Sequence, residues 1–181
     1  MKSDVILIDN HGSGFSEAVN AAKQIARFKG LGEKETLRLQ LLAEELLSMA
    51  RSVTGEMQAS FWLECEENTY ELHMTTEAVL GREMRSNLIA AATSKRNEAA
   101  GSFLGRLRDV FEQAMASDVY YTSDYIFYEM TGEMRADQPI SVVDGPEWDR
   151  YELSILKKLA DEVKVYIRGR QVHLSVKKTF A

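Results

Sequence analysis

The chain of 181 residues has little cysteine and proline and no long apolar run. Its single cysteine, Cys65, excludes a disulfide framework and a cysteine-based zinc site. The amino-terminal segment MKSDVILIDNHG contains too short an apolar run for a signal peptide, and no run is long enough to cross a bilayer. These absences predict a cytoplasmic protein that does not enter the membrane.

The chain also lacks an excess of positive charge. Lysine and arginine total 22 residues against 28 aspartates and glutamates, which gives a formal net charge of −6. A chain with this charge is not expected to bind nucleic acid or an anionic membrane surface as its main partner. Its apolar content of 45% is typical of a globular protein. We therefore expect a single domain over residues 1–181.

Apolar periodicity predicts helices alternating with antiparallel hairpins. A short strand, Val5 to Ile8, precedes a helix with Ser16 as its N-cap, and a second helix follows from Leu37. Period-two alternation then predicts one hairpin turning at Glu67-Asn68 and a closing hairpin turning at Gly169-Arg170. Hairpins covered by helices on one face form an α+β fold, a two-layer α/β sandwich with a mostly antiparallel sheet.

Residues 81–147, between the two hairpins, form a largely helical insert in this scheme. The pattern is helical from Gly81 to Ser117, with Gly101-Ser102 as a candidate break between two helices. Val119 to Met130 is rich in aromatic residues, and its pattern fits either a strand or a helix. A further helix is predicted from Trp148 to Asp161.

The helix from Leu37 carries an apolar stripe with helical spacing. Its members are Leu39, Leu42, Leu46, Met49 and Val53. On this pattern alone Met49 fills the core, and Glu45 is a surface carboxylate rather than a catalytic base. His73 and His173 fall on strand faces opposite the apolar residues, where we expect half-exposed structural side chains and no metal site.

The string LAEELLSMA in this helix resembles the first box of the histidine-kinase-type ATPases (the GHKL superfamily, with the Bergerat fold). The likeness is strongest to the anti-sigma-factor serine kinases. The two leading helices and the ending ILKKLADEVKVYIRGRQVHLSVKKTF resemble the same family, so the resemblance covers about residues 1–75 and 147–181. It implies a Bergerat-type sandwich, in which the insert replaces the lid over ATP. It also implies ATP with Mg²⁺ as the cofactor of a functional pocket.

Within that family the first box carries a Glu that polarises the attacking hydroxyl or water and, four residues later, an Asn whose oxygen holds Mg²⁺. Glu45 matches the Glu, but Met49 stands at the Asn position. Mg²⁺ requires hard oxygen ligands, whereas a thioether is soft and uncharged. The resemblance therefore suggests Glu45 as the only catalytic candidate and argues against Mg-ATP chemistry.

The other nucleotide boxes are altered as well. Where the family has an Asp-x-Gly-x-Gly turn for the base, this chain has Thr75 to Gly81, in which Thr76 would bind a base only weakly. Where the family has a glycine-rich phosphate loop, Glu147 to Leu153 has no glycine and three carboxylates, and bulky side chains such as Trp148 would fill the phosphate position. Met49, Thr76, Gly81 and Trp148 thus mark the positions of a vestigial pocket, for which no cofactor is expected.

Three functions are compatible with these residues. The first is a non-catalytic or weakly nucleotide-binding regulator, which contacts a sigma factor or an anti-anti-sigma-like protein in bacterial signalling. The second is an active ATP-dependent serine/threonine kinase with Glu45 as its base and an atypical metal site. The third is a dimeric interaction module that works through the insert. The resemblance favours the first of these.

Overall fold

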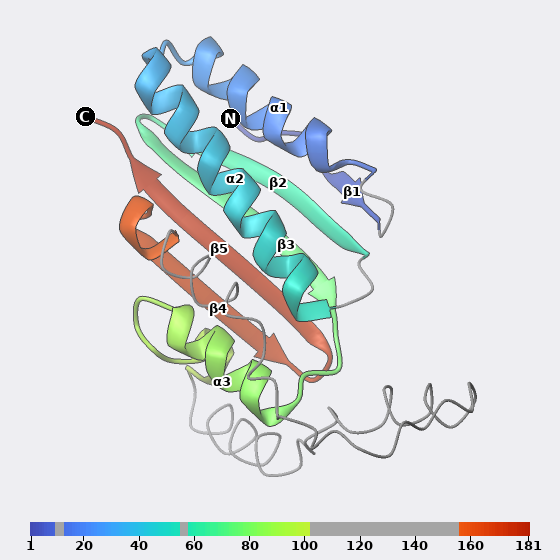
Figure 1. Ribbon diagram of the computed structural model, residues 1–181. Coiled ribbons are helices and arrows are strands. Elements are labelled where there is room, and N and C mark those ends of the chain that lie inside the picture. The colour runs from blue at the N-terminus through green and yellow to red at the C-terminus, as the bar shows by residue number, and fades with distance from the viewer. Residues whose placement is uncertain (10–12, 55–57, 102–155) are drawn as a thin grey trace, which may run out of the picture.

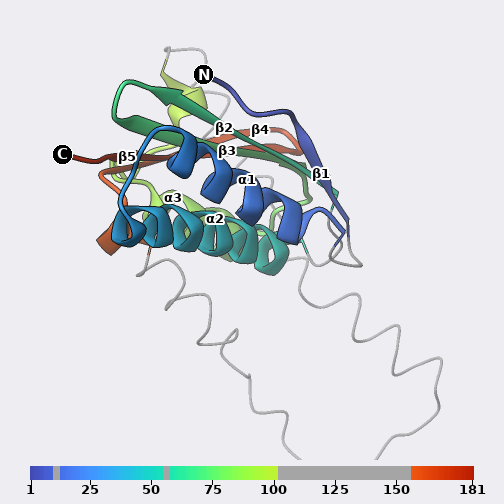
Figure 2. The ribbon, with the colours of Figure 1, turned by 90° about the horizontal axis from the view of Figure 1, so that it is seen from above.

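The computed structural model of the protein describes residues 1–9, 13–54, 58–101 and 156–181. Its strands form one antiparallel sheet in the order β1-β2-β3-β5-β4. Their bounds are β1 (Ile6–Ile8), β2 (Ala59–Glu66), β3 (Thr69–Glu77), β4 (Glu162–Arg168) and β5 (Gln171–Thr179). The helices α1 (Phe15–Phe28), α2 (Glu33–Thr54) and α3 (Arg82–Ala91) lie on one face of the sheet (Figures 1 and 2). The predicted α+β arrangement, an antiparallel sheet with helices on one face, is confirmed.

The two predicted hairpins are confirmed with their alternation. In the first, Phe61 pairs with Met74 and Leu63 with Leu72, and all four side chains point to the helices and are buried. In the closing hairpin the paired and buried residues are Val163 with Val176, Val165 with Leu174, and Ile167 with Val172. Because successive strand residues point to opposite faces, the other half of each strand lies on the face that no described helix covers, called here the open face.

The core lies between the helices and the sheet. Helix α1 contributes Ala18, Val19, Ala22, Ile25 and Ala26. Helix α2 contributes Leu39, Leu42, Ala43, Leu46, Leu47 and Met49. Three of the five buried residues of α1 are alanines, whereas five of the six from α2 are large side chains. Burial of these stripes, rather than helix propensity, holds both helices in place.

The start of α1 differs from the prediction. The helix begins at Phe15, and its N-cap is Gly14, which has φ 80° and makes no side-chain capping bond. Ser16 therefore lies inside the helix. A Cβ at Gly14 would stand 2.1 Å from the carbonyl oxygen of Leu7, so the chain passes too close to β1 for any other residue. A glycine takes the place of a hydroxyl cap because backbone contact decides this position.

The region after Gly81 is less continuously helical than predicted. Helix α3 ends at Ala91, and a short 3₁₀ turn, η1 (Glu98–Ala100), follows a non-helical stretch. After the helix, the side chain of Asn97 bonds to the edge strand β4: its amide N–H donates to Ile167 O (2.9 Å), and its amide oxygen accepts from Ile167 N (2.8 Å). The backbone of Thr93 adds a bond to Val163 O. These contacts cover the edge of β4.

The rest of the predicted insert lies outside the described residues. This applies to the helix predicted up to Ser117, to the aromatic segment Val119 to Met130, and to most of the helix predicted from Trp148. The end of that last helix is described, and residues 156–159 are helical. None of the described helices combines the length and the apolar character that crossing a bilayer would require.

Candidate functional site

The two positions that match the first ATPase box lie on α2. Met49 is 2% exposed and belongs to the same buried cluster as Leu42 and Leu46, so the prediction that it packs in the core is confirmed. Glu45 lies one turn earlier and is partly exposed. The thioether of Met49 is enclosed and offers no oxygen to a cation.

The other positions of the predicted pocket have structural contacts or lie outside the description. Thr76, near the end of β3, is buried, and its hydroxyl donates to the carbonyl of Gln58 at 3.0 Å. Gly81 is the N-cap of α3 with φ −65°, a backbone conformation that any residue adopts. Trp148 lies outside the described residues. The Thr76 hydroxyl thus fastens the start of β2 to the end of β3.

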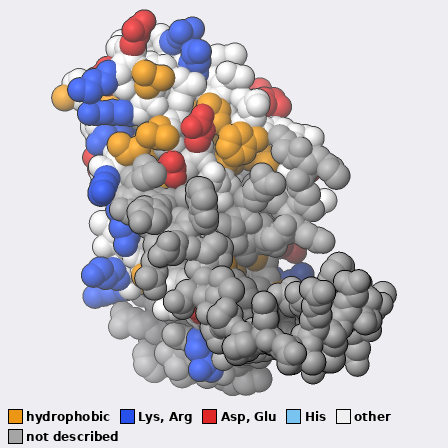
Figure 3. Space-filling view, viewed as in Figure 1, with side chains coloured by type: hydrophobic (Ala, Val, Ile, Leu, Met, Phe, Trp, Pro, Cys, Tyr) orange, Lys and Arg blue, Asp and Glu red, His pale blue; other side chains and the backbone are white. Residues whose placement is uncertain are grey.

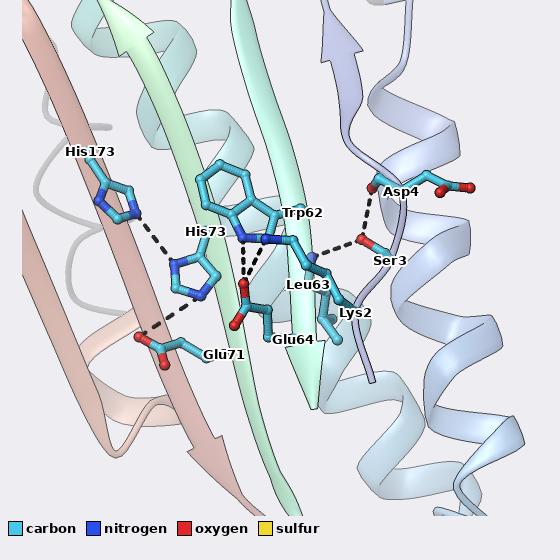
Figure 4. Close-up of polar contacts among 9 residues, drawn as sticks. All are labelled: Lys2, Ser3, Asp4, Trp62, Leu63, Glu64, Glu71, His73 and His173. Atoms are coloured by element: carbon cyan, nitrogen blue, oxygen red, sulfur yellow. Dashed lines mark hydrogen bonds and ion pairs between the residues drawn. The ribbon is translucent and has the colours of Figure 1, made fainter. Parts of the chain in front are cut away.

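The open face carries a row of four stacked rings that the sequence did not suggest (Figure 4 draws three of them). The rings are Trp62 on β2, His73 on β3, His173 on β5 and Tyr166 on β4. Centroids lie 4.9 Å apart for Trp62 and His73, 5.5 Å for the two histidines, and 5.1 Å for His173 and Tyr166. The ring planes of these neighbours differ by at most 28°. The row therefore crosses the sheet from β2 to its edge at β4.

The two histidines form the centre of this row. Nδ1 of His73 and Nε2 of His173 are 3.3 Å apart, so one of these nitrogens carries a hydrogen and donates a hydrogen bond that the other accepts. Nε2 of His73 is buried and 4.0 Å from Oε1 of Glu71. Burial lowers the pKa of both imidazoles, and their mutual repulsion lowers the pKa of His173 further. The pair is therefore held in its neutral form.

The expectation of half-exposed histidines is wrong for His73, which is 9% exposed. The rings of Trp62 and His173 cover it from both sides. The two histidines are 100 residues apart in sequence and meet because β3 pairs with β5. The prediction that both histidines lie on strand faces opposite the apolar residues is confirmed, but only the strand order brings the two side chains together. Within the described part of the chain, no group of three or more His, Cys, Asp or Glu residues is arranged to hold a metal ion.

Charged residues border the Trp62 end of the row. Lys2 Nζ lies 5.2 Å from the centre of the indole ring and 2.9 Å from Oε1 of Glu64, which also accepts from the indole N–H at 3.1 Å (Figure 4). The bond from Lys2, aided by that from Trp62, lowers the pKa of the Glu64 carboxyl. These contacts with Lys2 and Glu64 help to fix the indole ring, which lies nearly parallel to the ring of His73.

A hollow of about 1310 Å³ extends over the end of the sheet where β1, β3 and β4 finish and β2 and β5 begin. Its lining includes residues of all five strands. On the open face these are Leu7, Ser60, Thr75, Glu77, Tyr166, Arg168, Gln171 and His173. Two members of the ring row, His173 and Tyr166, therefore form part of its wall. Sequence reasoning missed this hollow because no single segment contains more than a few of its residues.

No protein-family model matches the chain, and a search of curated proteins gives no match either.

Proposed function

We propose that the chain is a non-catalytic relative of the anti-sigma-factor kinases, with a Bergerat-type sandwich, and that it regulates a bacterial signalling protein by direct contact. The order of helices and hairpins supports the fold assignment, since an antiparallel sheet with its helices on one face matches the architecture that the resemblance implies. In this proposal ATP and Mg²⁺ are not working cofactors.

The burial of Met49 is the observation that carries the proposal. At the position where the family holds its metal, this chain has a side chain enclosed among core residues of α2 and the sheet. Glu45 retains its carboxylate, but a base without the metal lacks the charge that stabilises the transferring phosphoryl group. Loss of such stabilisation costs on the order of 10²–10³ in rate for a single group.

The test has two measurements. Titration calorimetry with excess MgCl₂ measures ATP binding, and an assay of released phosphate measures ATP turnover. We expect neither binding in the micromolar range nor turnover above a blank. Magnesium-dependent turnover that disappears in Glu45→Ala, while Glu44→Ala retains it, would instead establish the active kinase. Glu44 is a suitable control because it is an exposed carboxylate on the same helix.

An apolar patch on the helical layer is the proposed contact surface. Phe28 at the end of α1 is 77% exposed, and Leu37 and Leu41 on α2 are 65% and 38% exposed. Leu37 and Leu41 are four residues apart and lie on one side of the helix. Figure 3 shows apolar side chains among charged ones over this face. Exposed apolar groups with a charged rim are typical of protein interfaces.

The partner test uses the double variant Leu37→Lys/Leu41→Lys in binding assays against purified sigma factors and anti-anti-sigma proteins. We expect one of them to bind the wild type and to bind the variant at least about tenfold more weakly. Light scattering at high protein concentration tests the remaining alternative, a dimer that works through the insert. A dimer that persists in the double variant would support it, whereas conversion to monomer would mean that the patch serves self-association.

A further inference from the structure

We propose that the hollow at the end of the sheet binds a small zwitterion that carries an α-ammonium group and a carboxylate, as in a free amino acid or a short peptide. This site is independent of the proposed regulatory function. The hollow lies at the end of the sheet and is lined from both faces; the charged residues on which the proposal depends are on the open face. Of the vestigial ATPase positions Thr76 lines the hollow, whereas Glu45 and Met49 belong to α2 and do not.

The first observation is a row of charges across three strands. Glu77 on β3 pairs in register with Gln171 on β5, which pairs with Arg168 on β4. All three are exposed and line the hollow. Adjacent strands are about 4.8 Å apart, so the stems of Glu77 and Arg168 stand roughly 10 Å from each other with the amide of Gln171 between them.

The second observation is that these opposite charges do not neutralise each other. In the described part of the chain, neither Glu77 nor Arg168 takes part in an ion pair or a side-chain hydrogen bond. Other charged residues of the same face do pair, as Glu162 does with Lys164 at 3.0 Å. A carboxylate and a guanidinium that border one space while unpaired are suited to the two ends of a dipolar ligand.

The third observation is the polar wall behind this row. One step further along the strands, Thr75 on β3 pairs with His173 on β5, which pairs with Tyr166 on β4, and all three line the hollow. His173 meets His73 through its Nε2 edge at 3.3 Å, and its ring lies 5.1 Å from that of Tyr166. A hydroxyl, an imidazole edge and a phenol are hydrogen-bonding groups of the kind that fix the orientation of a polar ligand.

Charge decides the class of ligand. An anion without a positive group would gain from Arg168 but would be repelled by Glu77 and by Asp9, which also lines the hollow. A simple cation would gain from Glu77 and be repelled by Arg168. A zwitterion gains from both, and the planar guanidinium of Arg168 is suited to bidentate binding of a carboxylate. A hollow of about 1310 Å³ leaves room for a side chain and for water.

The experiment is a binding screen on the full chain by ligand-observed NMR, followed by calorimetry on each hit. The probes are the twenty amino acids, the peptides Ala-Ala and Ala-Ala-Ala, and the single-charge controls acetate and ethylammonium. We expect at least one zwitterion to bind and both single-charge controls to fail. The relative affinity of a hit and of its peptide form then identifies the source of the zwitterion.

The variants Arg168→Gln and Glu77→Gln should each weaken binding about tenfold or more, since each removes one charge-assisted contact. Matched controls are Arg170→Gln and Glu66→Gln, which change exposed charges that do not line the hollow and should leave affinity unchanged. Circular dichroism checks that all four variants fold. The proposal is overturned if the wild type binds no zwitterion, if acetate binds as well as the amino acid, or if either hollow variant binds like its control.

Discussion

Phe61 and Trp62 are neighbours on β2, yet they are buried in different ways. Phe61 points to the helices and is fully enclosed by a separate layer of the fold, as are Leu63 and Leu72. Trp62 points to the open face, where a histidine ring on the next strand and the side chains of Lys2 and Glu64 surround it. The helix-covered face thus excludes water by packing two layers, and the open face does so only locally, by cross-strand contacts.

This difference suggests that the helix-covered face determines the stability of the fold, whereas the open face is available for binding a ligand. A face sealed by helices has no room for a ligand, and its side chains are selected for shape and apolar area. An open face keeps polar groups at the surface, where they can pair with each other, as the two histidines do, or stay available, as Glu77 and Arg168 do. We therefore expect stability to respond mainly to changes on the helix-covered face and ligand binding to changes on the open face.

The largest expected effect is the loss of a large side chain from the helix-covered face. Phe61→Ala should lower the free energy of unfolding by about 3–5 kcal/mol, because it leaves a cavity in a closed core. Trp62→Ala, one residue along, should cost only about 1–2 kcal/mol, since the indole is partly exposed and loses mainly stacking. Urea denaturation measures both. Equal costs would mean that the open face contributes as much to stability as the core.

The second effect concerns the vestigial metal position. Met49→Asn should lower the free energy of unfolding by about 1–3 kcal/mol, because the amide would be buried without assured hydrogen-bond partners. Met49→Leu keeps the volume and apolar character and should cost less than about 1.5 kcal/mol. If Met49→Asn is neutral while Met49→Leu is not, the side chain faces a polar space, and the proposal of a non-catalytic pocket fails.

Much of the helix-covered face was predictable from the sequence, because its signal is local. Alternation along β2, β3, β4 and β5 and the stripe through Leu42, Leu46 and Met49 each encode burial within one segment. The start of α1 was mispredicted for a non-local reason, the contact of Gly14 with the backbone of Leu7. The prediction of a continuous helix after Ala91 was also wrong, and the contacts found there are non-local too, since Asn97 bonds to Ile167 of β4, 70 residues later.

The open face was less predictable because its features depend on strand order. The sequence places His73 and His173 on polar strand faces, but only pairing of β3 with β5 puts the two imidazoles 3.3 Å apart. The row of Glu77, Gln171 and Arg168 likewise requires the register of two strand pairs. No local pattern carries that information, and the candidate ATPase positions do not include these residues.

The third prediction is a pH dependence that originates on the open face. Burial lowers the folded-state pKa of both His73 and His173, and Glu71 opposes this lowering. The pKa of His173 is lowered further by His73, while the pKa of His73 is raised by Glu64 and lowered by Lys2. The unfolded chain, with ordinary histidine pKa values of about 6.5, takes up protons first as the pH falls. The free energy of unfolding should therefore decrease from about pH 6.5 down to the lowered folded-state pKa values.

Urea midpoints between pH 7.5 and 5 measure this decrease. The double variant His73→Gln/His173→Gln should lose most of the slope just below pH 6.5, while His11→Gln, which changes the remaining histidine, should keep it. Carboxylates contribute at the acidic end of this range in all the variants alike, so the difference between wild type and variant is the quantity to compare. Equal slopes would mean that the stacked pair is no more protected than an exposed histidine.

The smallest expected effect tests whether an exposed contact at the border of the ring row matters. Lys2 and Glu64 form an ion pair of 2.9 Å between largely exposed side chains, so Lys2→Ala should cost at most about 1 kcal/mol, and less at high salt. A more sensitive measurement is the pKa of Glu64 by NMR, which should rise in Lys2→Ala because the bond from Lys2 is the largest cause of its lowering. The rise should be incomplete, since the indole N–H of Trp62 still donates to Glu64. Lys2→Arg should keep the pKa low, and an unchanged Glu64 pKa in Lys2→Ala would show that the ion pair does not persist in solution.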